Sequence, residues 1–173
     1  MKELEVAKRV ARQAGELLMA ERGSRLEVVI KDDMSPCTQI DRLSSMFITG
    51  ELLRKFPDYG MIDEESLIHN ILPNTRYKWV VDPLESTISY MKGAENFGVM
   101  IGLLYDSTPI LGVAYRPMID ELAFAAAGKG AFAETKGCIR QIKVNDSCEK
   151  DILVSLFRDD VEIEKIIGAF GED

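Results

Sequence analysis

Apolar residues recur at helical spacing in two stretches near the start of the chain. In residues 3–21 they fall three or four positions apart, which predicts an amphipathic helix that ends at Gly23-Ser24. Residues 41–56 repeat the pattern, and Pro57-Asp58-Tyr59-Gly60 ends the second helix. The apolar positions of the two stretches are Val6, Val10, Ala14, Leu17, Leu18, Leu43, Met46, Phe47, Leu52, Leu53 and Phe56. We therefore predict two helices in the first third of the chain.

Shorter apolar runs predict strands between and after these helices. Short strands are expected at residues 26–30 and 61–62, with a polar loop at 31–38 that contains Pro36. A buried strand is expected at 77–81. Later runs joined by turn sequences predict antiparallel strands, at residues 97–105, 110–115 and 121–126 and in a hairpin over 128–132 and 139–144. The fold class predicted is α+β, with the two helices packed on a largely antiparallel sheet.

The last residues begin a second unit. Residues 152–157 have the pattern of a strand and residues 161–170 that of a short helix. One strand and one helix cannot bury their apolar faces by themselves. Three interpretations stay open, namely packing on the main domain, pairing with another chain, or absence of the rest of a second domain. We assign residues 1–148 to an N-terminal α+β domain and 149–173 to the incomplete start of a second α/β domain.

Composition and charge exclude several classes of function. A chain of 173 residues with 46% apolar and 29% charged residues is typical of a globular protein. Its net charge of −8 argues against a nucleic-acid partner or an anionic membrane surface. No apolar run reaches membrane-spanning length, the N-terminus lacks a signal-peptide profile, and three cysteines are expected to be reduced thiols. We therefore expect a cytoplasmic protein.

Two acid-rich motifs follow apolar strands and carry the candidate chemistry. Residues 63–66 read Asp-Glu-Glu-Ser, and residues 82–87 read Asp-Pro-Leu-Glu-Ser-Thr. If the strands ending at Ile62 and Val81 are neighbours, Glu64, Asp82 and Glu85 converge, and such carboxylates suit Mg²⁺. Each motif alone also fits a plain structural role, as a solvated charge pair or a turn that ends a strand. Together they favour a metal site.

The residues after Asp82 add oxygen and hydroxyl groups to this site. The Leu84 carbonyl can supply a further metal ligand, because Pro83 stiffens the turn that presents it. Ser86 and Thr87 open a turn or helix whose N–H and hydroxyl groups suit a phosphate. Thr87 can position an attacking water, with Glu64 or Asp41 as the proton partner. The sequence therefore predicts a phosphate position directly beside the carboxylates.

The two motifs together resemble those of the inositol monophosphatase family, whose members are Mg²⁺-dependent, lithium-sensitive phosphatases. The resemblance covers nearly the whole chain, in the family's order, and implies the first half of a layered αβαβα sandwich. The matching segments are Ala11–Leu18, Lys31, Thr38–Asp41, Glu64–Ser66, Asp82–Thr87, Val99–Leu103, Gly112–Pro117 and Gly128–Phe132.

The resemblance implies a role for each site residue. Glu64, Asp82, the Leu84 carbonyl and Glu85 would be metal ligands, and Glu64, Thr87 and Asp41 would activate and orient the nucleophilic water. Ser86, Thr87 and Lys31 would face the substrate phosphate. Members of the family use two or three Mg²⁺ ions. The substrate implied is a small sugar or nucleotide phosphate.

Three departures from the family pattern lead us to expect a truncated and impaired enzyme that binds fewer ions. Glu85 stands where the family has aspartate, and Ser86 stands where it has glycine. The third departure is that the family's later metal motif has no counterpart before Asp173. The alternative is a degenerate, non-catalytic member that binds metal or phosphate weakly or acts as an assembly module. We also expect a homodimer, because a second copy could cover the terminal strand and the acid cluster.

Overall fold

The computed structural model describes residues 1–32, 34–66, 70–72 and 74–143. Residues 1–143 form one unit of the chain. The expected elements at 152–157 and 161–170, the boundary at 148/149 and the end of the last predicted hairpin lie outside the described residues, so those predictions stay predictions.

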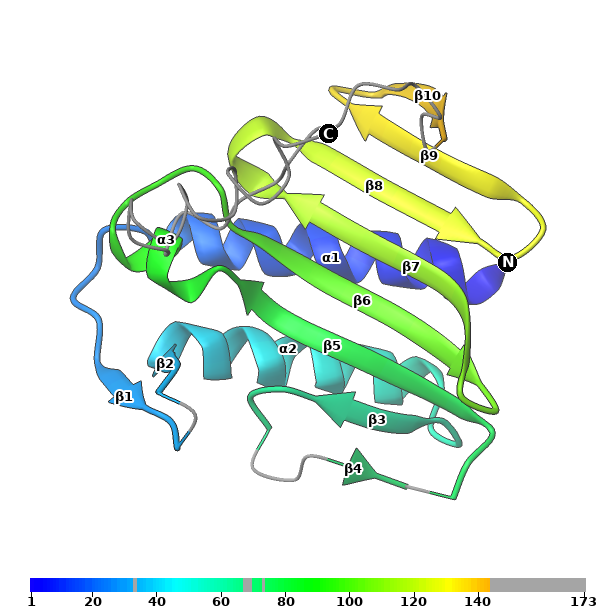
Figure 1. Ribbon diagram of the computed structural model, residues 1–173, viewed down its shortest axis with the longest axis horizontal. Helices are drawn as coiled ribbons and strands as arrows, with labels where there is room; N and C mark the ends of the chain where they lie inside the picture. The colour runs from blue at the N-terminus through cyan, green and yellow to red at the C-terminus, as the bar shows by residue number, and fades with distance from the viewer. Residues whose placement is uncertain (33, 67–69, 73, 144–173) are drawn as a thin grey trace, which may run out of the picture. The chain divides into compact units, whose positions relative to one another are not determined.

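Two long helices pack on one face of a sheet (Figure 1). Helix α1 (Lys2–Ala20) lies against strands β6 and β7, and helix α2 (Gln39–Lys55) lies against β5. Helix α2 begins two residues before its predicted start because Thr38 caps it. The Thr38 hydroxyl accepts hydrogen bonds from the N–H groups of Ile40 and Asp41, and the Asp41 carboxylate accepts one from the Thr38 N–H at 2.8 Å. Both predicted helices are confirmed.

The main sheet has eight strands in the order β10-β9-β8-β7-β6-β5-β3-β4. Every neighbouring pair is antiparallel except β3 and β5, which are parallel. The strands are β3 (Gly60–Asp63), β4 (Asn70–Ile71), β5 (Tyr77–Glu85), β6 (Gly98–Tyr105), β7 (Thr108–Arg116), β8 (Glu121–Ala126), β9 (Gly130–Thr135) and β10 (Cys138–Ile142). The short helix α3 (Thr87–Met91) and a 3-10 turn, η1 (Pro117–Ile119), connect strands. The predicted α+β class with a largely antiparallel sheet is confirmed.

The structure corrects the prediction at three places, one of which is strand β4, where no strand was predicted. Residues 31–38 were predicted to be a loop, yet Pro36–Thr38 form strand β2, which pairs with β1 (Val28–Ile30) in a separate two-stranded sheet. A proline is compatible with this position because the two-stranded sheet has only edge strands. Strand β5 also extends beyond the predicted Val81 to Glu85, through an irregularity in its pairing with β6 between Asp82 and Glu85.

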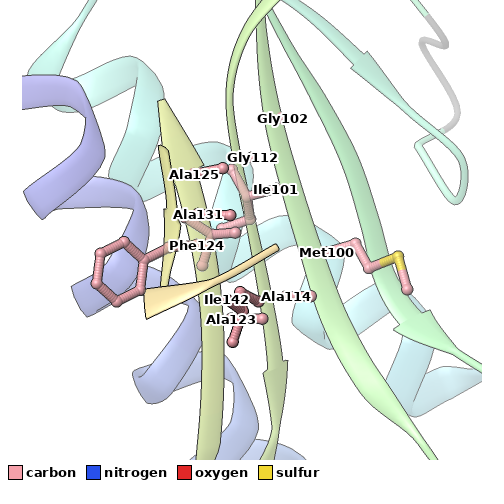
Figure 2. Close-up of a pocket in the computed structure, with 11 residues that line it drawn as sticks. Met100, Ile101, Gly102, Gly112, Ala114, Ala123, Phe124, Ala125, Ala131 and Ile142 are labelled. Atoms are coloured by element: carbon pink, nitrogen blue, oxygen red, sulfur yellow. The ribbon is translucent and has the colours of Figure 1, made fainter. Parts of the chain in front are cut away.

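The core lies between the helices and the sheet. Its fully buried side chains include Trp79 and the aliphatic Leu18, Ile48 and Ile101, and each aliphatic side chain contributes about 1.5–3 kcal/mol by burial. The opposite face of the sheet carries a shallow apolar hollow of about 400 Å³, lined largely by small side chains such as Ala114 (Figure 2). No helix in the described part of the chain is long and apolar enough to cross a membrane.

Candidate metal and phosphate site

The two acid-bearing segments lie side by side because β3 and β5 are parallel neighbours. Ile62 pairs with Val80 and Asp63 with Val81, and the Glu64 N–H donates to the Val81 carbonyl at 3.2 Å. Both strands therefore deliver their acids to the same edge of the sheet. The adjacency on which the predicted convergence depended is confirmed.

Asp82 carries the electrostatic signature of a crowded acid cluster. Burial raises its pKa to about 8, helped by a hydrogen bond with Glu85 and by the negative charges of Glu64 and Glu85. A carboxylate with such neighbours is costly to ionise unless a cation offsets the repulsion. The three predicted carboxylates therefore interact with one another through their charges.

Thr87 and Asp41 are joined directly, although 46 residues separate them. The Thr87 hydroxyl donates to Asp41 Oδ1 at 2.7 Å and also lies 3.2 Å from the Leu84 carbonyl oxygen. Asp41 is fully buried, and burial raises its pKa despite hydrogen bonds from Thr38 and Thr87. The structure thus brings Asp41, Leu84 and Thr87 together in one hydrogen-bonded group beside the carboxylates.

Hydrogen bonds hold the irregular part of β5 between Asp82 and Glu85. The Ser44 hydroxyl on α2 donates to the Pro83 carbonyl at 2.9 Å, and the Leu84 N–H donates to Asp82 Oδ1 at 3.1 Å. These contacts fix the turn between Asp82 and Glu85 against helix α2. Ser44 was not predicted from sequence, where it is one of several polar residues on a helix.

Lys31 pairs with the acid cluster. Its Nζ lies 2.9 Å from Glu64 Oε1 and 2.8 Å from Glu65 Oε1. Burial lowers the pKa of Lys31, but the two carboxylates outweigh burial, and the net shift is upward. Lys31, which was predicted to face the phosphate, therefore lies beside the acid cluster and forms ion pairs with Glu64 and Glu65 in this structure.

Two acids beside Glu64 were missed as site residues. Glu65 has a side chain that is only 7% exposed and that binds Lys31. Asp63 is buried and accepts hydrogen bonds from Ser45 at 2.7 Å, Thr49 at 2.9 Å and the Glu65 N–H at 3.0 Å. The sequence Asp63-Glu64-Glu65 does not indicate which of the three side chains is buried. The serine and threonine on α2, four residues apart, were the available signal for Asp63.

Ser86 adopts a conformation that favours glycine. Its φ of 67° and ψ of 53° are left-handed, and it forms the N-cap of α3 without a side-chain capping bond. Its hydroxyl instead lies 3.3 Å from Glu85 Oε1. The departures at positions 85 and 86 thus contact each other, and the serine occupies a turn that its side chain strains.

The donor set fits a hard divalent cation by its chemistry. Carboxylate and carbonyl oxygens are the ligands that Mg²⁺ prefers, and burial, together with the neighbouring Glu85 and Glu64, raises the pKa of Asp82. No group of three His, Cys, Asp or Glu side chains within the described ranges is arranged to hold an ion as the structure stands. Lys31 binds Glu64 in this arrangement, so metal binding requires Glu64 to exchange that partner.

Comparison with known proteins gives a family. The model of the inositol monophosphatase family matches residues 2–167. The 3'(2'),5'-bisphosphate nucleotidase CysQ of Escherichia coli O157:H7 is 32% identical over 166 residues, which are 94% of this chain and 67% of the relative. The fructose-1,6-bisphosphatase/inositol-1-monophosphatase of Aquifex aeolicus is 32% identical over 84% of this chain and 54% of the relative.

Solved structures agree with the sequence relatives. The extragenic suppressor protein suhB of Bartonella henselae superposes with a TM-score of 0.78 at 30% identity, covering 85% of this chain and 56% of that one. The IMPase of Thermotoga maritima gives a TM-score of 0.75 at 29% identity, covering 84% and 55%. The chain thus spans about half the length of these two structures and of the Aquifex relative.

Proposed function

The chain belongs to the inositol monophosphatase family, and we propose that it hydrolyses the phosphate ester of a small sugar or nucleotide with Mg²⁺ as cofactor. The observation that carries the proposal is the hydrogen bond of Thr87, just after β5, to Asp41, next to the edge where the parallel strands β3 and β5 end in acids. Carboxylates for a cation and a hydroxyl oriented by a buried acid are what metal-assisted hydrolysis requires.

Each proposed metal ligand follows from this arrangement. Glu64, Asp82, Glu85 and the Leu84 carbonyl would hold Mg²⁺. When bound, Mg²⁺ would activate water and stabilise negative charge on the attacking and leaving oxygens. The raised pKa of Asp82 means that its carboxylate is costly to ionise at this position. A bound cation would offset that cost, which supports the assignment.

The remaining residues position water and phosphate. The Thr87 hydroxyl donates to Asp41, so its lone pairs are free to accept a hydrogen bond from the attacking water. Glu64 would take part in removing the proton of that water. The hydroxyls and N–H groups of Ser86 and Thr87 would bind the phosphate oxygens, and Lys31 would meet the phosphate once it leaves Glu64.

A non-catalytic family member is the second candidate, and specific observations favour it. Ser86 strains the turn that would face the phosphate, and Lys31 binds Glu64. Fewer ions would then bind than in other members. In this version the chain binds metal or phosphate weakly, or serves in an assembly.

Two further proposals concern partners and location. We propose a homodimer, since the exposed apolar side chains of Val28, Val29 and Ile30 on β1 offer a surface for a second copy. The net charge of −8 supports a small phosphorylated metabolite as the ligand, rather than a nucleic acid or a membrane surface. A cytoplasmic location is proposed because the cysteines are expected to be reduced thiols.

Phosphate release from inositol phosphate, fructose bisphosphate and adenosine bisphosphate tests the proposed activity. The proposal predicts Mg²⁺-dependent release that Asp82→Asn abolishes. Arg76→Gln is the matched control, because Arg76 forms an exposed ion pair with Asp106 away from the acid cluster. If phosphate release from all three esters stays at background even at high protein concentration, the proposed activity is refuted and the non-catalytic candidate is favoured.

A further inference from the structure

Helix α2 buries polar side chains on the side that faces the candidate site. The predicted apolar residues Leu43 and Met46 are exposed, whereas Asp41, Ser44 and Ser45 are buried. Residues three and four apart lie on the same side of a helix, so Asp41 and the two serines form one polar row. Because buried polar groups need hydrogen-bond partners, the contacts of this row show which segments it holds.

The two serines of the row hold the ends of both strands that carry the proposed metal ligands. The Ser44 hydroxyl donates to the Pro83 carbonyl oxygen in β5 at 2.9 Å. The Ser45 hydroxyl donates to Oδ2 of Asp63, the last residue of β3, at 2.7 Å. Adjacent residues of one helix therefore fix β5 and β3 against the same element, and a site supported by a helix is held more precisely than one on loops.

Asp63 connects helix α2 to the backbone of the next two residues. Its Oδ2 accepts hydrogen bonds from Ser45 and, at 2.9 Å, from Thr49. Its Oδ1 accepts a hydrogen bond from the Glu65 N–H at 3.0 Å. The residue is 1% exposed, and burial of a carboxylate among neutral donors is costly. An apolar side chain would fill the same space at a lower cost, but it could not hold the Glu65 N–H.

We propose that Asp63 is a positioning residue that holds the backbone of Glu64 and Glu65 and so presents the Glu64 carboxylate to a cation. The inference rests on the proposed function for the cation, whereas the hold on the backbone is a property of the metal-free chain. A fixed backbone leaves the Glu64 side chain free to exchange Lys31, with which it pairs at 2.9 Å, for a metal ion. Loss of a residue that orients a metal ligand lowers metal affinity about 10- to 100-fold.

The test compares three variants of the full chain. Asp63→Ala removes every contact of the carboxylate. Asp63→Asn removes the same charge but keeps an oxygen that accepts from the Glu65 N–H, so it separates positioning from charge. Leu122→Ala is the matched control, because it opens a cavity in the core at β8, three strands from β5, and lowers stability away from the site. Unfolding followed by the fluorescence of Trp79, the chain's one tryptophan, checks that each variant is folded.

Two quantities are measured for each variant. The first is the hydrogen-exchange rate of the Glu65 amide in the metal-free chain, followed by NMR, and the second is the Mg²⁺ affinity, measured by calorimetry. The inference predicts that Asp63→Ala exchanges the Glu65 amide about tenfold faster than Leu122→Ala does. It also predicts that Asp63→Ala binds Mg²⁺ about tenfold more weakly than the wild type. Asp63→Asn should stay close to the wild type in both quantities.

The two measurements separate failure of the inference from failure of the proposed function. Equal exchange of the Glu65 amide in Asp63→Ala and Leu122→Ala, or equal losses of Mg²⁺ affinity in Asp63→Ala and Asp63→Asn, would overturn the inference. If Asp82→Asn abolishes Mg²⁺ binding while Asp63→Ala binds like the wild type, the proposed function stands and the inference fails. If the wild-type chain binds no Mg²⁺, the proposed function fails, and the exchange rates alone decide whether Asp63 holds the backbone.

A double variant covers the case in which Asp63→Ala does not fold. Ser45→Ala combined with Thr49→Val removes the anchor on α2 and leaves Asp63 in place. The inference predicts faster Glu65 exchange and weaker Mg²⁺ binding in this variant than in Leu122→Ala. Wild-type values of both quantities in the double variant would overturn the inference.

Discussion

Replacing Ser86 by glycine should stabilise the chain. Ser86 has a φ of 67° and a ψ of 53°, and a left-handed conformation costs a residue with a Cβ about 1–2 kcal/mol. Glycine removes that cost but loses more backbone entropy on folding, by about 0.5–1 kcal/mol. The lost hydroxyl contact with Glu85 is long, at 3.3 Å, and exposed, so it offsets little. The net expectation is a stabilisation of about 0.5–1 kcal/mol, or about 2 °C in Tm for a chain of this size.

Thermal unfolding of Ser86→Gly and Ser86→Ala, measured without divalent cations, separates strain from other effects. Both substitutions remove the hydroxyl, but only glycine relieves the left-handed backbone, so only glycine should raise Tm. Trp79 is fully buried and reports loss of the core by its fluorescence. A Tm that rises equally in both variants, or falls in Ser86→Gly, would refute the conformational reasoning.

Two further predictions concern the site, and two concern the buried thiol of Cys37. Asp82→Asn should raise the Tm of the metal-free chain, because the amide replaces a carboxyl group whose ionisation is disfavoured by burial and by the neighbouring Glu85 and Glu64. The same substitution should abolish stabilisation by Mg²⁺, and a variant that Mg²⁺ still stabilises would argue against Asp82 as a ligand. Thr87→Val should lower kcat about 100-fold with a smaller effect on KM. Thr87→Ser should retain activity, because its hydroxyl can still donate to Asp41. Equal losses of activity in the two variants would mean that the hydroxyl is not the group that acts. Burial raises the pKa of the Cys37 thiol from 9.0 to about 11, so iodoacetamide near pH 8 should label exposed Cys138 well before Cys37 in peptide mass spectra. Because the folded state holds this proton more tightly, Cys37 should also make folding less favourable as pH rises from 9 towards 11, and Cys37→Ala should reduce that loss.

The parts of the fold that sequence predicted are those with repeated apolar spacing. Helix α1 and the strands from β5 to β8 bury the apolar side of such patterns. Helix α2 follows its predicted pattern only in part, because Leu43 and Met46 are exposed whereas Ser44 and Ser45 are buried. Strand β2 was missed because it is short and contains Pro36, a residue that usually argues against a strand. Local pattern does not determine such short pairings.

The sequence predicted which two segments meet at the candidate site, but not all of its residues or its internal contacts. The parallel pairing of β3 and β5 brought together the acids that the motifs suggested. The ion pair of Lys31 with Glu65 and the burial of Asp63 were not predicted, because both depend on contacts between segments that are distant in the sequence. The left-handed turn at Ser86 could be anticipated only from its place in a motif where the family has glycine.

Calorimetric titration of inorganic phosphate with and without Mg²⁺ tests the central claim most directly. The claim is that the acid cluster and the Ser86–Thr87 turn form one site in which cation and phosphate bind together. It predicts measurable phosphate binding that requires Mg²⁺ and is lost in Asp82→Asn. Phosphate binding of equal strength without Mg²⁺, or the absence of any Mg²⁺-linked heat at the acid cluster, would contradict it.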